Sequence, residues 1–311
     1  MKRKNKGAAN RARSNQTSPA HVQRDGEGRV HLALLRDPET SQPRIVLEVP
    51  VFEEIWQNDV AAATANTVYA LLGSRPSVSQ TVQLGKSAMA GTSRLTEGLL
   101  EHAPPGSLAC KAGCDHCCYQ VVGVTAPEAL TIWDHLKRTQ DDAALADLVQ
   151  RLSEVLEKSR GLSNEERFSP QHPCAFLRDG ACSIYEVRPL SCRGMNSLSA
   201  DECAQRLRDP ELRARFLKGD VAGQSFMEPI RAFHAVSAGL QLGLSEIYQL
   251  DTQPLELAAA VHLLLTRGNV VARDWVAGLN SFEAARGGDS THNAGVRALS
   301  GALSSPLATD E

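Results

Sequence analysis

Aromatic residues are scarce in this sequence, since Phe, Trp and Tyr together make up 5% of its 311 residues. This scarcity disfavours a large aromatic-lined cleft and a stacking platform for single-stranded nucleic acid. The sequence also lacks the Gly-x-Gly-x-x-Gly pattern of nucleotide-binding loops, any sign of a Ser-His-Asp triad, and any internal repeat. Several large enzyme classes therefore have no signature in this chain.

Long apolar runs are missing as well. The longest apolar stretch, Leu257 to Leu265, is interrupted by His262 and is far shorter than the ~20 residues that cross a membrane. No apolar segment of a signal peptide follows the basic start, so we expect a cytoplasmic protein without a membrane partner. In that reducing compartment, clustered cysteines favour metal ligands or redox groups over disulfides.

Acidic residues are absent from the start of the chain. Residues 1–24 contain seven basic side chains and no acidic one, whereas the rest of the chain has a net charge of −10. An acidic body disfavours broad nucleic-acid binding. We expect residues 1–28 to be a disordered basic tail that keeps the protein soluble or contacts a protein partner, and residues 287–311 to be a flexible tail.

Between these tails the sequence predicts a mainly α fold, with a helical body, a small N-terminal β-hairpin and an inserted cysteine-rich metal-binding segment. Turn formers separate the short apolar runs 30–35 and 44–49, which is typical of a hairpin. Periodicity and helix-end signals predict helices over residues 51–72, 78–102, 145–156, 255–266 and 272–286, with a stop at Arg267-Gly268 after the fourth. Further helices are expected to begin at the capping box Thr125-x-x-Glu128, at Asp209, and after Pro229, the last running to about residue 250. The expected divisions are 29–104 (hairpin plus helices), 105–205 (cysteine cluster) and 206–286 (helical region). Gly239 and Gly243, four residues apart, predict close helix packing.

Cysteine is absent from residues 1–109 and 204–311, and all eight cysteines lie between Cys110 and Cys203. The first group follows the spacing i, i+4, i+7, i+8. On a helix these thiols would fall within an arc of about 100°, and in a loop Gly113 would help the chain to turn, so both geometries bring the sulfurs together. An apolar core stripe is the alternative, but it would normally use Leu, Ile and Val.

The second group begins at Cys174. The turn signal Arg178-Asp-Gly predicts a tight hairpin that brings Cys174 and Cys182 together, and Pro189 redirects the chain before Cys192. The flanking arginines, Arg188 and Arg193, either offset the negative charge of a thiolate–metal centre or donate hydrogen bonds to sulfur, or they form ordinary surface or fold-stabilising salt bridges. Cys203 we interpret as a spare thiol.

Crowded thiolates repel one another, and a cation of charge two or more removes that penalty. Zinc in Cys₄ sites and iron–sulfur clusters both use such ligands. His116 and His172, next to the cysteines, are weaker ligand candidates, whereas His234 and His262 lie in apolar helices and are expected in the core or at a helix edge.

Two motifs stand out in the cysteine-rich segment: Cys-x3-Cys-x2-Cys-Cys, and the block Ile-Tyr-Glu-x-Arg-Pro-x-x-Cys-Arg that ends at Arg193. Through these motifs, about residues 105–200 resemble the YkgJ-type family of cysteine-cluster proteins. That family is described as a zinc- or iron-chelating domain. Ala175 stands where the family usually has Pro, and Cys203 lies outside the pattern. The resemblance implies the metal-binding positions Cys110, Cys114, Cys117, Cys118, Cys174, Cys182 and Cys192.

Three functions are therefore weighed. The first is a cytoplasmic protein that binds an iron–sulfur cluster or zinc through these thiolates. The second is an iron–sulfur enzyme that modifies protein lysines or a small substrate, since a flagellin lysine methylase resembles the family in its cysteine pattern. The third is a metal-stapled adaptor for a protein or nucleic-acid partner. Seven thiolates exceed one Cys₄ zinc site, and the spacings lack paired Cys-x2-Cys knuckles, which favours iron–sulfur. The alternative is a two-zinc thiolate cluster with bridging sulfurs, which would also use about seven cysteines and accounts for the adjacent Cys117 and Cys118.

Overall fold

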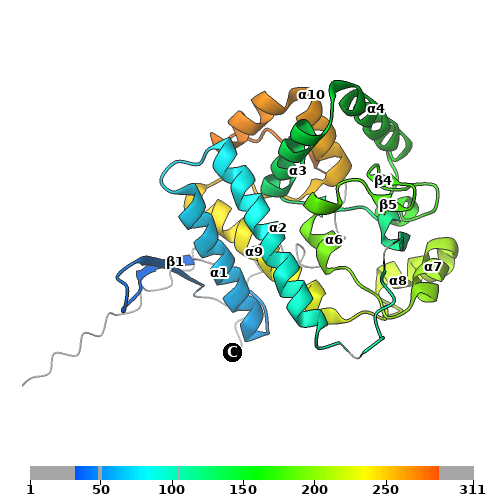
Figure 1. Ribbon diagram of the computed structural model, residues 1–311, viewed down its shortest axis with the longest axis horizontal. Coiled ribbons are helices and arrows are strands. Elements are labelled where there is room, and N and C mark those ends of the chain that lie inside the picture. The colour runs from blue at the N-terminus through cyan, green and yellow to red at the C-terminus, as the bar shows by residue number, and fades with distance from the viewer. Residues whose placement is uncertain (1–31, 48–50, 104, 112, 287–311) are drawn as a thin grey trace, which may run out of the picture.

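The computed structural model describes residues 32–47, 51–103, 105–111 and 113–286, most of which are helical (Figure 1). The mainly α fold class with a small N-terminal strand pair is confirmed. The tails expected at 1–28 and 287–311 lie outside the described residues. Within the described part, no helix combines the length and apolarity that a membrane crossing requires.

The N-terminal hairpin forms as predicted. Strands β1 (Leu32–Arg36) and β2 (Pro43–Leu47) pair antiparallel. The Asp37 carboxylate organises the turn between them by accepting two backbone hydrogen bonds. On the other side, the Asn66 amide donates to the Ile45 carbonyl (2.8 Å), which ties β2 to the first helix.

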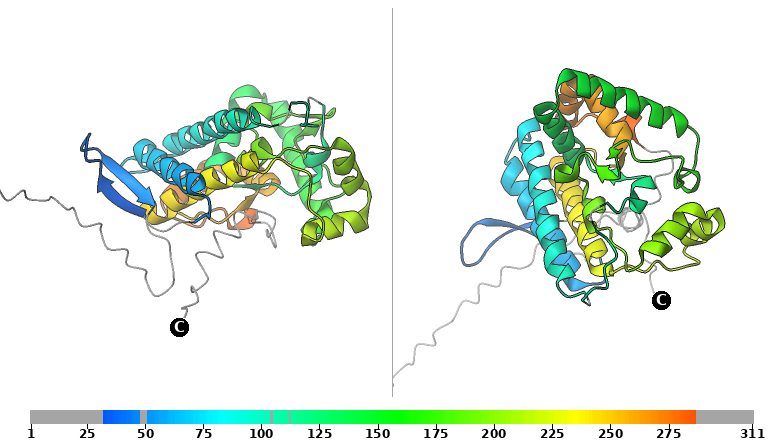
Figure 2. Two further views of the ribbon diagram at one scale, coloured as in Figure 1. Left: turned by 90° about the horizontal axis from the view of Figure 1, so that it is seen from below. Right: turned by 45° about the vertical axis from the view of Figure 1, so that its right-hand side comes forward.

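Three long helices form one layer of the body: α1 (Ile55–Leu72), α2 (Val78–Leu100) and α9 (Met227–Leu242). They lie side by side in both Figures 1 and 2. The helix predicted over 51–72 begins at Ile55, because the four residues before it are bent. Gly73, with φ of +58°, ends it as expected.

Two glycines explain how α1 and α9 approach each other. A Cβ atom on Gly239 would lie 2.3 Å from the Ala61 carbonyl oxygen, and one on Gly243 would lie 2.9 Å from Val68. The close packing predicted from their spacing is therefore confirmed. After α9 the chain continues as a π-helical turn, η3 (Gly243–Ile247).

A second helical group consists of α3 (Ala126–Thr139), α4 (Asp142–Lys158) and α10 (Leu257–Val276). Helix α10 packs against both α3 and α4. A two-residue strand pair, β3 (Gly123–Val124) with β6 (Leu255–Glu256), joins the chain just before α3 to the chain just before α10.

The stop predicted at Arg267-Gly268 corresponds to a break in helical geometry. Two helical segments of α10 meet there at a kink, since Arg267 has a non-helical φ of −138° and ψ of 15°. Gly268 has another reason to be glycine, because a Cβ atom there would lie 2.5 Å from the Trp133 ring. The helix predicted over 272–286 is thus the second half of α10, followed by a turn and the short 3₁₀ helix η4 (Glu283–Ala285).

The cysteine segment folds as short elements between these helices. They are η1 (His116–Tyr119), α5 (Asn164–Arg167), β4 (Leu177–Arg178), β5 (Ala181–Cys182), η2 (Tyr185–Val187) and α6 (Leu190–Gly194). A helical hairpin of α7 (Ala200–Arg208) and α8 (Pro210–Lys218) follows and projects at the end of the molecule opposite the β1–β2 hairpin (Figure 2). Asp209 caps α8 as predicted, whereas α7 was not predicted from the sequence.

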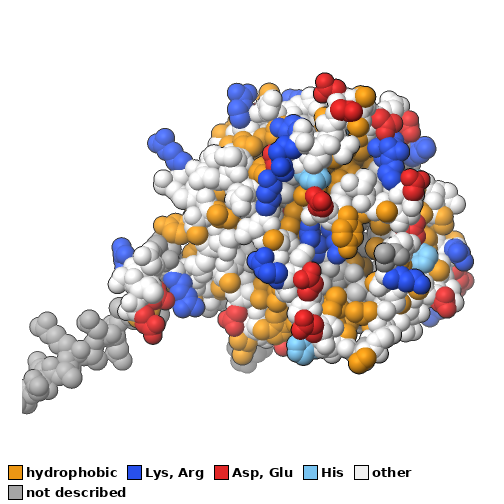
Figure 3. Space-filling model, in the orientation of Figure 1, with side chains coloured by type: hydrophobic (Ala, Val, Ile, Leu, Met, Phe, Trp, Pro, Cys, Tyr) orange, Lys and Arg blue, Asp and Glu red, His pale blue; other side chains and the backbone are white. Residues whose placement is uncertain are grey.

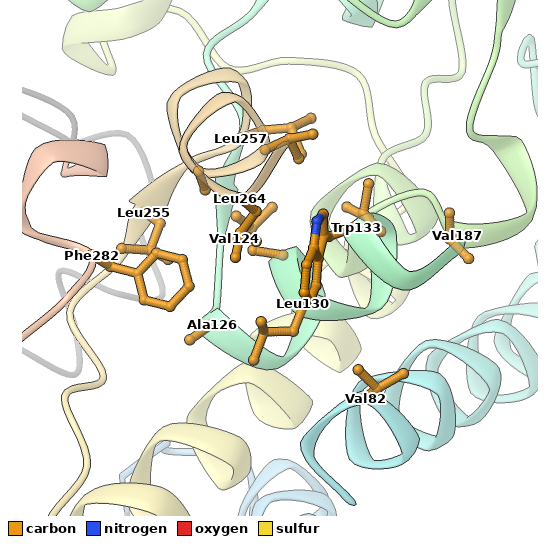
Figure 4. Close-up of a cluster of buried hydrophobic side chains, with 14 of the residues drawn as sticks. Val82, Val124, Ala126, Leu130, Trp133, Val187, Leu255, Leu257, Leu264 and Phe282 are labelled. Atoms are coloured by element: carbon orange, nitrogen blue, oxygen red, sulfur yellow. The ribbon is translucent and has the colours of Figure 1, made fainter. Parts of the chain in front are cut away.

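One large apolar cluster connects these parts. Trp133 and Leu130 lie in the middle of the side chains drawn in Figure 4, Phe282 lies beside Leu255, and Val187 joins the cluster from the cysteine segment. Phe176, which is 1% exposed, belongs to the same cluster. Burying a side chain of this size contributes about 2–3 kcal/mol, so the core holds the cysteine segment in place. On the face drawn in Figure 3, basic and acidic side chains are interspersed.

Candidate metal centre

The first four cysteines lie on a loop that ends in a 3₁₀ turn. Gly113 adopts a φ of +84°, so the loop alternative, in which this glycine turns the chain, describes the structure better than a continuous helix. The Cys114 N–H donates to the Lys111 carbonyl (3.0 Å), and the Cys118 N–H donates to the Asp115 carbonyl (2.7 Å). The two hydrogen bonds close two tight turns in the segment that carries these thiols.

The second group forms the predicted hairpin. Strands β4 and β5 pair with Leu177 opposite Cys182, and Asp179 and Gly180 both have positive φ values, as a type I′ turn requires. A backbone hydrogen bond from Cys174 N–H to the Cys118 carbonyl (2.7 Å) attaches this hairpin to the first group. Two segments that are distant in the sequence therefore meet at these cysteines.

Helix α6 carries the third segment, with Cys192, and a single carboxylate fixes its start. One oxygen of Glu128 accepts the Leu190 N–H (2.8 Å), while the other accepts the backbone N–H and the hydroxyl of Thr125 (2.8 Å each). The predicted capping box of α3 is thereby confirmed, and the same side chain also holds α6. Glu128 is 2% exposed, and burial raises its pKa while these hydrogen bonds oppose the rise.

Five thiols gather where these segments meet. The charge of Cys118 would interact with those of Cys174 and Cys192, and the charge of Cys117 with those of Cys174, Cys182 and Cys192. The five come from η1, the β4–β5 hairpin and α6. We call them the central thiol group: Cys117, Cys118, Cys174, Cys182 and Cys192.

Within this group ionisation is unfavourable for every thiol except one. The Cys118 thiol donates a hydrogen bond to Cys117, which lowers the pKa of Cys117 to about 7 and raises that of Cys118. Burial raises the pKa of Cys174 to about 12, and it raises the pKa values of Cys182 and Cys192 as well. Neighbouring thiolate charges add to the increase, so several of these thiols ionise together only when a cation compensates them.

Arg188 places positive charge beside the group. Its charge interacts with Cys117, Cys182 and Cys192, and its guanidinium packs on the Tyr185 ring (4.5 Å). Arg193 donates to the carbonyls of Arg188 (2.9 Å) and Glu186 (2.6 Å), and its charge interacts with Cys182 and Cys192. Arg188 therefore fits charge compensation, and Arg193 fits both charge compensation and stabilisation of the local fold.

Cys110 and Cys114 lie to one side of the central thiol group. The Cys110 sulfur accepts a hydrogen bond from the Ser197 N–H (3.2 Å). Its charge would interact with those of Cys114, Cys117 and Cys203, and partial desolvation raises its pKa. Cys203, interpreted as a spare thiol, is thus a neighbour of Cys110. The signal that could have placed it is Ser199-x-x-Glu202, since Ser199 caps α7.

Three of the histidines weighed from the sequence occupy different settings. His116 lies between the cysteines, with its Nδ1 atom 3.9 Å from Asp115. His234 is largely buried, which lowers its pKa to about 4. The His262 Nε2 atom pairs with the Ser153 hydroxyl (3.0 Å), so this ring is at a helix interface.

A pocket of about 90 Å³ opens beside Cys174 and is also lined by His172. Lys158 lies at its wall, and Arg167 forms an ion pair with Glu256 there (3.3 Å). This arrangement offers net positive charge next to a thiol, which suits a small anionic molecule.

The donor set and its crowding fit a thiolate-bound metal. All eight cysteines are free thiols, and soft thiolates are the ligands that zinc and iron–sulfur clusters use. In the described part of the chain, no three Cys, His, Asp or Glu side chains already adopt metal-ligand geometry. Metal binding would therefore require thiol side chains to turn toward a common point.

Residues 109–209 match a family model. The model is CxxCxxCC, "Putative zinc- or iron-chelating domain". The matched region contains all eight cysteines, and it agrees with the cysteine-cluster resemblance stated from the sequence. Neither the curated proteins nor the solved structures contain a match to the chain.

Proposed function

We propose that the protein binds an iron–sulfur cluster or zinc through clustered cysteine thiolates. The proposed ligand positions are those that the resemblance implies: Cys110, Cys114, Cys117, Cys118, Cys174, Cys182 and Cys192. The observation that carries the proposal is the meeting of five thiols from three separate segments. A reducing compartment such as the cytoplasm suits eight free thiols.

Crowding explains why this arrangement needs a metal. Burial and mutual repulsion raise the pKa values of four of the five central thiols, so each further thiolate costs free energy unless a cation is present. A bound metal supplies that charge, and Arg188 offsets part of the remaining negative charge. An apolar core would not place thiols beside a guanidinium in this way.

Iron–sulfur is favoured over zinc. Each iron of a cluster accepts one thiolate, so ligands can come from separated segments such as η1, β5 and α6. A zinc-ribbon site would use paired knuckles, and here Cys118 follows Cys117 directly. Four of the central thiols would suffice for one cluster.

The test is anaerobic purification of the full chain, followed by its visible spectrum and analysis of iron, zinc and acid-labile sulfide per chain. An iron–sulfur centre gives brown protein with broad absorption near ~400 nm, which zinc cannot produce. Colourless protein with stoichiometric zinc and no sulfide would show that the bound metal is zinc and not an iron–sulfur cluster. A chain with neither metal would refute the proposed function.

The pocket beside Cys174 supports a second candidate, an enzyme that acts on a small substrate. Because Lys158 and Arg167 line it, the pocket suits an anionic substrate better than a lysine side chain. The measurement that separates the two candidates is a shift of the visible spectrum when small carboxylates are added to the metal-loaded protein. An unchanged spectrum across such compounds counts against the enzyme.

A further inference from the structure

Cys203 lies outside the seven ligand positions, yet the fold brings it to the cysteine loop. It is on α7, in the helical hairpin that projects at one end of the molecule (Figure 2). Helix α7 contacts η1, the turn that carries Cys117 and Cys118. Cys203 therefore faces the first cysteine group from a separate element.

The backbone fixes this approach. The Ala109 N–H donates to the Ser197 carbonyl (2.9 Å), and the Ser197 N–H donates to the Cys110 sulfur (3.2 Å). The segment just before Cys110 and the segment just before α7 are thus joined by a backbone hydrogen bond. Cys110, Cys114 and Cys203 are close enough for the Cys110 charge to interact with both others.

A buried cation accompanies Cys203. The Nη2 atom of Arg206 lies 3.5 Å from the Cys203 sulfur, and Arg206 as a whole is 8% exposed. Its guanidinium stacks on the Phe216 ring (4.1 Å), and its Nε atom forms an ion pair with the Glu202 carboxylate (3.6 Å). Arg206 thus places a positively charged donor beside the Cys203 sulfur, and Glu202 balances part of its charge.

We propose that Cys110, Cys114 and Cys203 form a second thiolate site, which binds one divalent metal ion of the zinc type. Cys117 belongs to the central thiol group, but its charge also interacts with Cys110, so it is placed to complete four ligands or to bridge the two sites. Arg206 offsets part of the excess negative charge of three thiolates around a dication. This inference rests on the proposed thiolate function, and it assigns Cys110 and Cys114 to the second site.

The second site has a mechanical consequence. A metal ion held by Cys110 and Cys203 would tie the α7–α8 hairpin to the cysteine loop. Its loss should therefore loosen residues 200–208 while the helical body stays folded. This effect separates the second site from the central thiol group, whose elements belong to the core.

The experiment compares the full-length wild type with Cys203→Ser and with the matched control Gln205→Ser, an exposed position on the same helix. Iron, zinc and sulfide per chain are measured after anaerobic loading, together with amide hydrogen exchange of residues 200–208. We expect Cys203→Ser to lose one zinc ion per chain, to keep the metal of the central thiol group, and to exchange at least about tenfold faster. Gln205→Ser should match the wild type.

A second variant keeps the test decisive if Cys203→Ser fails to fold. Cys203→His retains a donor that zinc accepts, so it should restore the zinc ion and the protection of α7. Wild-type zinc content and exchange in folded Cys203→Ser would overturn the second site and leave the proposed function intact. A folded Cys203→His variant without the zinc ion would also overturn it. A wild-type chain that binds no metal would refute both proposals.

Discussion

The Glu128 carboxylate is the contact through which the helical core positions a proposed metal ligand. It is buried and accepts hydrogen bonds from the N–H groups of Thr125 and Leu190. Glu128→Gln replaces one of its oxygens by an NH₂ group, which would face one of these donors. Each buried donor left unsatisfied costs about 1–3 kcal/mol, so we expect a loss of about 2 kcal/mol in the free energy of unfolding.

Glu128→Ala should cost about 4 kcal/mol, because both backbone donors then lose their acceptor. Both variants should also weaken metal retention by about 10- to 100-fold, the usual effect of removing a group that orients a ligand, since α6 carries Cys192. The assay is urea unfolding followed by circular dichroism, with metal content measured on the same preparations.

The matched control is Glu166→Gln. Glu166 forms the same capping box with Ser163, but on the exposed short helix α5, where water can replace the lost oxygen. Little change in stability or metal content is therefore expected for this variant. Equal destabilisation by Glu128→Gln and Glu166→Gln, or full metal retention in Glu128→Gln, would refute the reasoning.

Three further predictions use other features of the molecule. Gly239→Ala should destabilise the protein by about 1–3 kcal/mol in urea unfolding, since the new Cβ atom would meet the Ala61 carbonyl. Gly98→Ala, with open space around it, should instead stabilise α2 by up to about 1 kcal/mol. Stability changes of the same sign in the two variants would contradict this prediction. The pKa of His234 is about 4, below the ordinary 6.5, so the unfolded state takes up a proton first as the pH decreases. The free energy of unfolding should therefore fall by at most about 3 kcal/mol between pH 6.5 and pH 4. His234→Gln should remove this pH dependence, and a pH profile parallel to that of the wild type would contradict the assignment. Cys182→Ser should lose the metal of the central thiol group and lower the melting temperature, measured by elemental analysis and calorimetry, whereas Ser183→Ala should do neither.

Local signals predicted the elements whose causes are local. The capping box at Thr125 and Glu128 formed as expected, because both partners lie within one helical turn. The Asp179-Gly180 turn formed because few residue pairs adopt two positive φ values so readily. The spacing of Gly239 and Gly243 likewise reported on a contact surface of a single helix.

Tertiary contacts explain what local signals missed. The signal at Arg267-Gly268 marked a real break in helical geometry, but it did not show that Gly268 leaves room for the Trp133 ring, a contact from another helix. The approach of Cys203 to Cys110 also depends on a tertiary contact, the backbone hydrogen bond from Ala109 to Ser197. The second role of Glu128, at the start of α6, could not be deduced from the spacing of its own capping box.

The hydrogen bond between Cys174 and Cys118 also bears on the order of folding. It closes a long loop, and most of that loop consists of α3 and α4. The entropy cost of closing a loop falls when its interior is already folded, because the ends are then held near each other. Packing of α3 and α4 against α10 should thus precede assembly of the centre, so newly made chains would capture metal only after α10 has been synthesised. Until then, the thiols would be exposed to oxidants and to competing metal ions.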